Sequence, residues 1–286
     1  MHEPPIDFRA EVGEFDRRAE VRRWDGPRHR MTFRVLGEGP PLVLIPGLAS
    51  TYRGYAPTLL RLGRRFRTIQ LDYPGEHPDD GARLDRITHD DLVDDLVGLV
   101  DHLGLAEIYP FGLSFGSTIT LKALHRDPKR FPKAALQGGF AHRRLRPDER
   151  LALRLGRRFR GDLSRLPFHE VGLASKNRRA FPDQIPDRWA QFVEENGLTP
   201  IAGMSHRLDI LDRLDLRPIL PEIRQDVLVI HGTADRIVPW THYEELVTCL
   251  PRAWPAPMAG VGHQPHWTHP EWLARLVGDF LHETSE

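Results

Sequence analysis

The sequence predicts an α/β fold in which helices cover both faces of a mostly parallel central sheet. Two observations carry this prediction. Short apolar runs recur along the chain, and stretches with helical periodicity separate them. One of these runs leads into a G-x-S-x-G segment, which is typical of a sharp turn from a strand to a helix. The alternation stops between residues 141 and 215, where we expect a helical insertion over the sheet.

Composition limits the classes of partner. The 286 residues are 40% hydrophobic, which is enough for one large core, and the formal net charge is +0. A balanced charge gives no general attraction to nucleic acid or to an anionic membrane, so neither partner is expected. The single cysteine, Cys249, excludes an internal disulfide. Residues 1–23 lack the apolar core of a signal peptide, and no run is long enough to span a bilayer, so we expect a cytoplasmic protein.

The chain begins with segments of different character. Residues 1–16 show no clear period and are expected to form an extension or arm. Residues 19–24 and 30–36 resemble strands, and the turn-forming sequence Asp25-Gly26-Pro27 between them predicts a hairpin. Residues 42–45 form a continuous apolar run, as expected for a strand that is buried on both faces.

The next elements follow the same signals. Residues 88–103 form the clearest helix, because their apolar residues fall on one face and Thr88 with Asp91 fits an N-terminal cap. The other expected elements before the insertion are helices at 55–62 and 117–125 and strands at 66–71, 108–111 and 134–137.

Three parts of the chain are therefore expected. Residues 1–140 form the first part of the core, residues 141–215 form a helical cap or lid, and residues 216–286 complete the core. Within the cap the helical signals lie around 149–159 and 187–214. After it we expect strands at 227–230 and 254–258 and a closing helix at 271–282.

Ser114 is the candidate nucleophile. A serine hydroxyl is a poor nucleophile at neutral pH, so it must be presented at an exposed turn and activated by a base. The turn crowds the residues two positions away on either side, and these are Gly112 and Gly116.

Asp235 and His263 are the candidate acid and base, because both follow a predicted strand near its carboxyl end. His263 would take the Ser114 proton, and Asp235 would orient the imidazole and stabilise its cation. The rival acids are Asp212 and Asp215, and the rival base is His266; His231 is expected to serve as a structural hydrogen-bonding residue.

These three stretches together resemble the α/β-hydrolase family. The chain carries G-x-S-x-G around Ser114, H-G-x-x-D-x-x-V-P at 231–239 and G-x-G-H-x-P at 260–265, in the family's order of nucleophile, acid and base. The resemblance extends from about residue 30 to residue 280. In this family the acid sometimes stands directly after the strand predicted here at 134–137, where this chain has glycines at 138 and 139. It implies an oxyanion hole formed by the backbone N–H groups of Leu48 and Phe115, although Pro46 stands where the family usually has histidine.

The expected function is that of a cofactor-free carboxylesterase-like serine hydrolase (EC 3.1.1) that acts on a small-molecule ester through an acyl-enzyme. The alternatives are C–C bond hydrolysis, lactone opening or acyl transfer on the same triad, and a non-catalytic binding protein with this fold. No metal site is expected, and a monomer and a dimer both fit the sequence.

Residues of the predicted cap are candidates for substrate binding. Its large apolar residues could line an acyl pocket or fill its own core, and the pocket candidates are Phe159, Phe168, Trp189 and Met204, with Phe181 and Phe192 as further possibilities. The cap is also rich in arginine, which predicts either a solvated helix face or a basic surface for acidic substrates or an acidic carrier protein.

Overall fold

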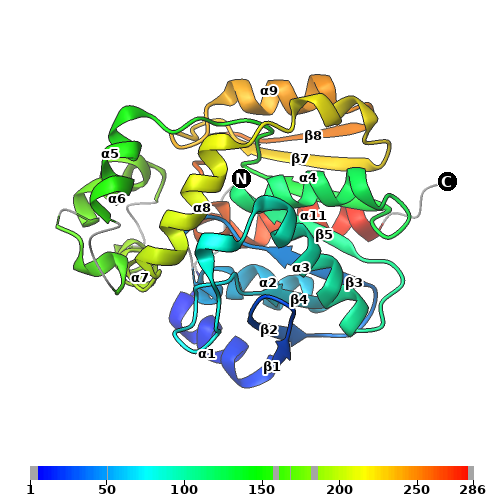
Figure 1. The fold of residues 1–286 in the computed structure, drawn as a ribbon, viewed down its shortest axis with the longest axis horizontal. Helices are drawn as coiled ribbons and strands as arrows, with labels where there is room; N and C mark the ends of the chain where they lie inside the picture. Colours follow the sequence, from blue (N-terminus) through cyan, green and yellow to red (C-terminus); the bar gives the residue numbers. More distant parts are fainter. Residues whose placement is uncertain (1–5, 50, 157–160, 168, 182–185, 283–286) are drawn as a thin grey trace.

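A computed structural model describes residues 6–49, 51–156, 161–167, 169–181 and 186–282. Eight strands form one sheet in the order β1-β2-β4-β3-β5-β6-β7-β8 (Figure 1). Strand β2 pairs antiparallel with β1 and β4, and the remaining neighbours are parallel, so the predicted mostly parallel sheet is confirmed. The strands are β1 (Glu20–Asp25), β2 (Arg30–Leu36), β3 (Pro41–Ile45), β4 (Arg67–Leu71), β5 (Tyr109–Leu113), β6 (Lys133–Gln137), β7 (Asp226–Gly232) and β8 (Ala253–Met258).

The central strands of the sheet are buried on both faces, as their continuous apolar runs predict. Along β3, Val43 and Ile45 join one core cluster while Leu42 and Leu44 join the other. The first cluster lies under α3 (His89–His102), α4 (Phe115–Arg126) and α9 (Trp240–Cys249), and the second lies under α2 (Ala56–Leu62) and α11 (Pro270–His282). Figure 1 shows α3 and α4 in front of the strands and α11 behind them.

Helix α3 confirms the clearest helical prediction. Thr88 caps it by accepting a hydrogen bond from the Asp91 N–H, and the Asp91 carboxylate accepts one from the Thr88 N–H. This reciprocal cap fixes the start of the helix one residue after Thr88.

Most of the predicted N-terminal arm is helical, because residues 8–18 form α1 (Phe8–Arg18), for which the sequence showed no clear period. Phe8, Val12 and Phe15 recur at helical spacing, and both phenylalanines are buried. Phe8 stacks on Trp267 at a ring-centroid distance of 4.1 Å. Three apolar residues on one side are enough to stabilise this highly charged helix, because they pack against the core of the protein.

Among the described residues, four α-helices lie between β6 and β7, and we call them the inserted helices. They are α5 (Pro147–Gly156), α6 (His169–Asn177), α7 (Pro186–Gly197) and α8 (Ile201–Arg213). In Figure 1, α5, α6 and α7 gather on the left and α8 runs from them towards the sheet. The chain leaves and re-enters the core at adjacent points, since His142 forms a β-bridge with Asp215. In the described part of the chain, no helix has the length and apolar character needed to cross a membrane.

A buried ionic group lies at the carboxyl end of β4. Asp72 accepts hydrogen bonds from Arg34 (2.8 Å) and pairs with His77 Nε2 (2.8 Å). Burial would raise the pKa of Asp72, but the bonds from His77 and Arg34 outweigh it and lower this pKa. The hydrogen bond to Asp72 raises the pKa of His77.

His77→Gln is expected to destabilise the protein mainly at acidic pH. Because the folded pKa of His77 is raised, the stabilisation from its charged form is complete below the unfolded pKa of about 6.5 and is lost as pH rises through the folded pKa. We expect a Tm about 2 °C lower at pH 5.5, and a smaller difference at about pH 8.5. Thermal unfolding at both pH values tests this, with the exposed His282→Gln as control; equal differences at both pH values would contradict it.

Candidate active site

Ser114 lies at the strained turn between β5 and α4. Its backbone has φ 49° and ψ −113°, and it is the only described residue other than glycine with a positive φ. The Ser114 N–H donates to the Gln137 carbonyl (2.8 Å), and its own carbonyl accepts from the Ser117 hydroxyl (2.6 Å). These bonds hold a backbone conformation that an L-residue rarely adopts.

The two glycines of the motif allow α4 to approach the sheet. A Cβ atom at Gly112 would lie 2.6 Å from the Gly116 carbonyl oxygen, and one at Gly116 would overlap the Ile45 carbonyl oxygen of β3. Larger residues would therefore displace the serine relative to its neighbours.

Ser114, His263 and Asp235 lie in one hydrogen-bonded row. His263 Nε2 is 3.0 Å from Ser114 Oγ, and His263 Nδ1 is 2.6 Å from Asp235 Oδ2. The three residues come from loops that follow β5, β8 and β7 respectively. Neighbouring parallel strands bring their carboxyl ends to one edge of the sheet, which is why residues 149 positions apart meet here.

The surroundings of Asp235 keep it ionised. Its other oxygen accepts hydrogen bonds from the N–H groups of Ile237 (2.8 Å) and Val238 (2.9 Å). Burial would raise the pKa of Asp235, but its interaction with His263 and these bonds outweigh burial and lower this pKa. An ionised Asp235 accepts the Nδ1–H of His263, and Nε2 is then free to accept a proton from Ser114.

Glycine at position 138 fits tightly against this row. Gly138 has φ 57°, and a Cβ atom there would lie 2.9 Å from His263 Cε1. The position that could have held an alternative acid therefore has no room for a side chain while His263 occupies this place.

The rival residues have other contacts. Asp212 pairs with Arg150 and Asp215 with Arg217. His231 Nε2 donates to the Val238 carbonyl (3.1 Å), which is a structural bond. His266 lies against the Tyr55 ring at 4.7 Å, and burial lowers its pKa to about 3, so this histidine is neutral.

The predicted oxyanion donors flank Ser114. Phe115 is the first residue of α4, where a helix offers its N–H no internal acceptor. The Leu48 N–H has no acceptor within the part of the chain that is described. Its neighbour Gly47 lies against Ser114, since a Cβ atom there would be 3.6 Å from Ser114 Cβ.

A cavity of about 350 Å³ opens onto Ser114, His263 and Leu48. Met204, a predicted pocket residue, lines it, but Trp189 does not and instead packs on Phe181 (5.2 Å) and Phe192 (5.5 Å). Phe159 and Phe168 lie outside the described residues. Among the described residues of the insertion, the apolar lining consists of Leu163, Leu166, Leu173, Phe192 and Met204, of which the three leucines were not predicted.

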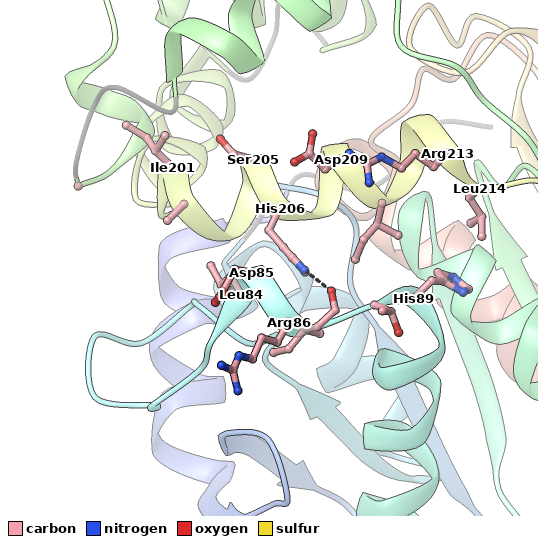
Figure 2. A pocket seen from close by; sticks show the side chains of 15 residues that line it. Leu84, Asp85, Arg86, His89, Ile201, Ser205, His206, Asp209, Arg213 and Leu214 are labelled. Atoms are coloured by element: carbon pink, nitrogen blue, oxygen red, sulfur yellow. Dashed lines mark hydrogen bonds between the residues drawn. The ribbon is translucent and has the colours of Figure 1, made fainter.

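A larger cavity of about 840 Å³ lies between α8 and the segment Leu84–His89 (Figure 2). Its lining includes charges of both signs, among them Asp209 and Arg213. Its Ser205 has no activating histidine in the described contacts, since His206 Nε2 bonds to the Ile87 carbonyl (2.8 Å). Size alone therefore does not mark this cavity as the reaction site.

Several arginines of the insertion are already in ion pairs. Arg143 and Arg146 contact Glu149, and Arg150 contacts Asp212. Arg146 and Arg150 are 47% and 44% exposed, which fits a solvated surface, whereas Arg143 is only 9% exposed and its ion pair with Glu149 is largely buried.

Comparison with known proteins identifies the family. Residues 40–270 match the family model described as alpha/beta hydrolase fold. The chain is 30% identical over 260 residues to polyketide synthase ThaQ of Burkholderia thailandensis, covering 87% of this chain but only 12% of that protein. It is 26% identical over 270 residues to the pimeloyl-[acyl-carrier protein] methyl ester esterase of Xanthomonas oryzae pv. oryzae, covering 88% of this chain and 98% of that one.

A solved structure has the same architecture. The enol-lactonase from Burkholderia xenovorans LB400 superposes with a TM-score of 0.79 at 23% identity, over 92% of this chain and all of that one. At this identity the likeness concerns the fold. With the family match over most of its length, the chain belongs to the α/β-hydrolase family.

Proposed function

We propose that the protein is a serine hydrolase that cleaves carboxylic esters of small molecules, with Ser114 as nucleophile, His263 as base and Asp235 as acid. The observation that carries the proposal is the continuous row of contacts, 3.0 Å and 2.6 Å long, that links the Ser114 hydroxyl to a buried carboxylate. It lies at the wall of a cavity large enough for a small ester.

The reaction has two halves. His263 accepts the Ser114 proton while Oγ attacks the ester carbonyl carbon, and the N–H groups of Leu48 and Phe115 bind the resulting oxyanion. The tetrahedral intermediate collapses to an acyl-enzyme, and His263 protonates the departing alcohol. Water, deprotonated by His263, then attacks the acyl carbonyl, and collapse releases the acid and returns the proton to Ser114.

The inserted helices, within the predicted cap at 141–215, are proposed to shape the acyl side of the site. Their apolar side chains would receive an acyl chain and keep it out of water. The relative named as a methyl ester esterase supports an ester with a small alcohol group.

The test is hydrolysis of p-nitrophenyl esters from acetate to decanoate, with stopped-flow detection of the acyl-enzyme burst. We expect turnover with a burst of one p-nitrophenol per protein chain whenever deacylation is the slower step. Parallel assays with a lactone and with a vinylogous 1,5-diketone separate the alternatives. Turnover of one of these without any ester turnover would contradict the proposal.

Gly172→Leu is expected to shift the preference towards shorter esters. Gly172 lines the cavity on α6, and a Cβ atom there would meet nothing within 4 Å, so a side chain can enter free space without backbone strain. We expect kcat/KM for octanoate to fall about tenfold relative to acetate, and Gly172→Ala, the control, to leave this ratio within about twofold. An unchanged ratio in Gly172→Leu would place the acyl chain elsewhere.

A further inference from the structure

The loop that carries the Leu48 N–H is held on both sides of that group. The Tyr73 hydroxyl donates to the Pro46 carbonyl (2.8 Å). The Arg207 guanidinium donates through Nε (3.0 Å) and Nη2 (2.9 Å) to the Leu48 carbonyl. Arg207 belongs to α8, one of the inserted helices, whereas the loop follows β3 of the sheet.

Peptide geometry connects these bonds to the oxyanion donor. A peptide unit is planar, so fixing a carbonyl also fixes the N–H of the next residue. The Pro46 carbonyl thus fixes the Gly47 N–H, which donates to the Tyr55 hydroxyl (3.1 Å). The Leu48 carbonyl in the same way fixes the peptide unit between Leu48 and Ala49. The peptide that carries the Leu48 N–H lies between these two fixed units, so its direction depends on both.

Arg207 is itself held rigidly. Its side chain is 3% exposed, its Nη2 lies 2.5 Å from Glu76 Oε1, and its guanidinium carbon lies 5.0 Å from the Tyr73 ring centroid. A buried guanidinium with a paired charge and two N–H groups on one acceptor has little freedom to turn. The Leu48 carbonyl is therefore bound to a fixed partner.

Helix α8 reaches this position because Gly203 allows close approach. A Cβ atom at Gly203 would lie 3.1 Å from the Gly75 carbonyl oxygen. Met204, one residue further, lines the cavity at Ser114. The same side of α8 thus contacts the core, borders the cavity and, one turn later, presents Arg207.

Helix α7 continues the contact along the loop. Asn196 Nδ2 donates to the Ala49 carbonyl (2.9 Å), and the Thr51 hydroxyl donates to Glu195 (2.5 Å). The inserted helices therefore bind the carbonyl groups of two consecutive residues, Leu48 and Ala49.

We propose that Arg207 is a positioning residue for the oxyanion hole, through which the inserted helices fix the direction of the Leu48 N–H. The catalytic part of this inference rests on the proposed ester hydrolysis. The inserted helices then complete the machinery that stabilises the transition state, in addition to covering the cavity.

The experiment uses the full-length chain with Arg207→Met combined with Glu76→Gln, so that no buried carboxylate is left without a partner. Glu76→Gln alone is the reference, and Arg150→Met, which removes another arginine bound to α8, is the matched control. We expect the double variant to lower kcat for p-nitrophenyl butyrate about 10- to 100-fold per titrated active site, with KM within about threefold. The inhibition constant of a trifluoromethyl ketone should rise by the same factor as kcat/KM falls.

Hydrogen exchange of the amides at 47–49 in the free protein provides a readout that does not depend on catalysis. We expect faster exchange in the double variant and no change in Arg150→Met. Unchanged exchange together with unchanged kcat per active site would overturn the proposal. If the wild-type protein hydrolyses no ester but the double variant still exchanges these amides faster than wild type, the proposed function is overturned and the role of Arg207 in holding the loop is supported.

A second variant keeps the test available if the double variant does not fold. Tyr73→Phe removes only the hydroxyl that binds the Pro46 carbonyl. We expect a kcat about threefold to tenfold lower at unchanged KM. If both kcat and amide exchange were unchanged in this variant, the inference that the loop is held on both sides of the Leu48 N–H would be contradicted.

Discussion

Ser114→Ala is expected to lower kcat for p-nitrophenyl butyrate by about 10⁵- to 10⁶-fold, because no acyl-enzyme can form without the hydroxyl oxygen. The cavity would be unaltered, so an uncleavable substrate analogue should bind with an affinity within about threefold of wild type. Steady-state hydrolysis and calorimetric titration of the analogue measure the two effects.

Ser205→Ala is the matched control for this change. Ser205 lies in the larger cavity at α8 and is 5% exposed (Figure 2). We expect its kcat to stay within about twofold of wild type. If Ser205→Ala abolished hydrolysis and Ser114→Ala did not, the reaction would have to be moved to the larger cavity.

Asp235→Asn is expected to lower kcat by about 10⁴-fold while the position of His263 is kept. A neutral amide cannot stabilise the imidazolium that forms when His263 takes the Ser114 proton. Its NH₂ group can also donate to Nδ1, which would leave the proton on Nε2 and remove the acceptor for the Ser114 hydroxyl. The measurement is kcat for p-nitrophenyl butyrate, together with the thermal stability of the variant.

The control for this substitution is Asp212→Asn, an equally conservative change at the rival acid. Asp212 binds Arg150 and the Leu145 N–H, and neither group contacts His263. We expect its activity to remain within about threefold of wild type. A large loss in Asp212→Asn with little loss in Asp235→Asn would reverse the assignment of the acid.

The sheet and its main helices could be predicted because their signals are local. The apolar run of β3 and the cap at Thr88 each depend on a few neighbouring residues. Helix α1 was missed because its stripe of Phe8, Val12 and Phe15 is short and surrounded by charges. Its stability comes from tertiary contacts such as the stacking on Trp267.

The lining of the cavity was harder to predict for a different reason. Helical periodicity identifies an apolar face but not the partner of that face, so Met204 and Trp189 were equivalent in the sequence. In the structure Met204 meets the cavity and Trp189 meets other aromatic rings. The contact of Arg207 with the loop after β3 was not predicted. The sequence held a signal for it, because Arg207 stands four residues after Gly203 and so lies on the same side of α8.

The bridge between His142 and Asp215 has a consequence for protein engineering. Because the two ends of the insertion meet, residues 143–214 could be exchanged for a relative's segment without lengthening or stretching the flanking chain. Such a graft would also remove Arg207 and Asn196, which bind the loop after β3. A chimera made to alter substrate preference therefore needs donors for the carbonyls of Leu48 and Ala49 if it is to retain the turnover rate of the parent.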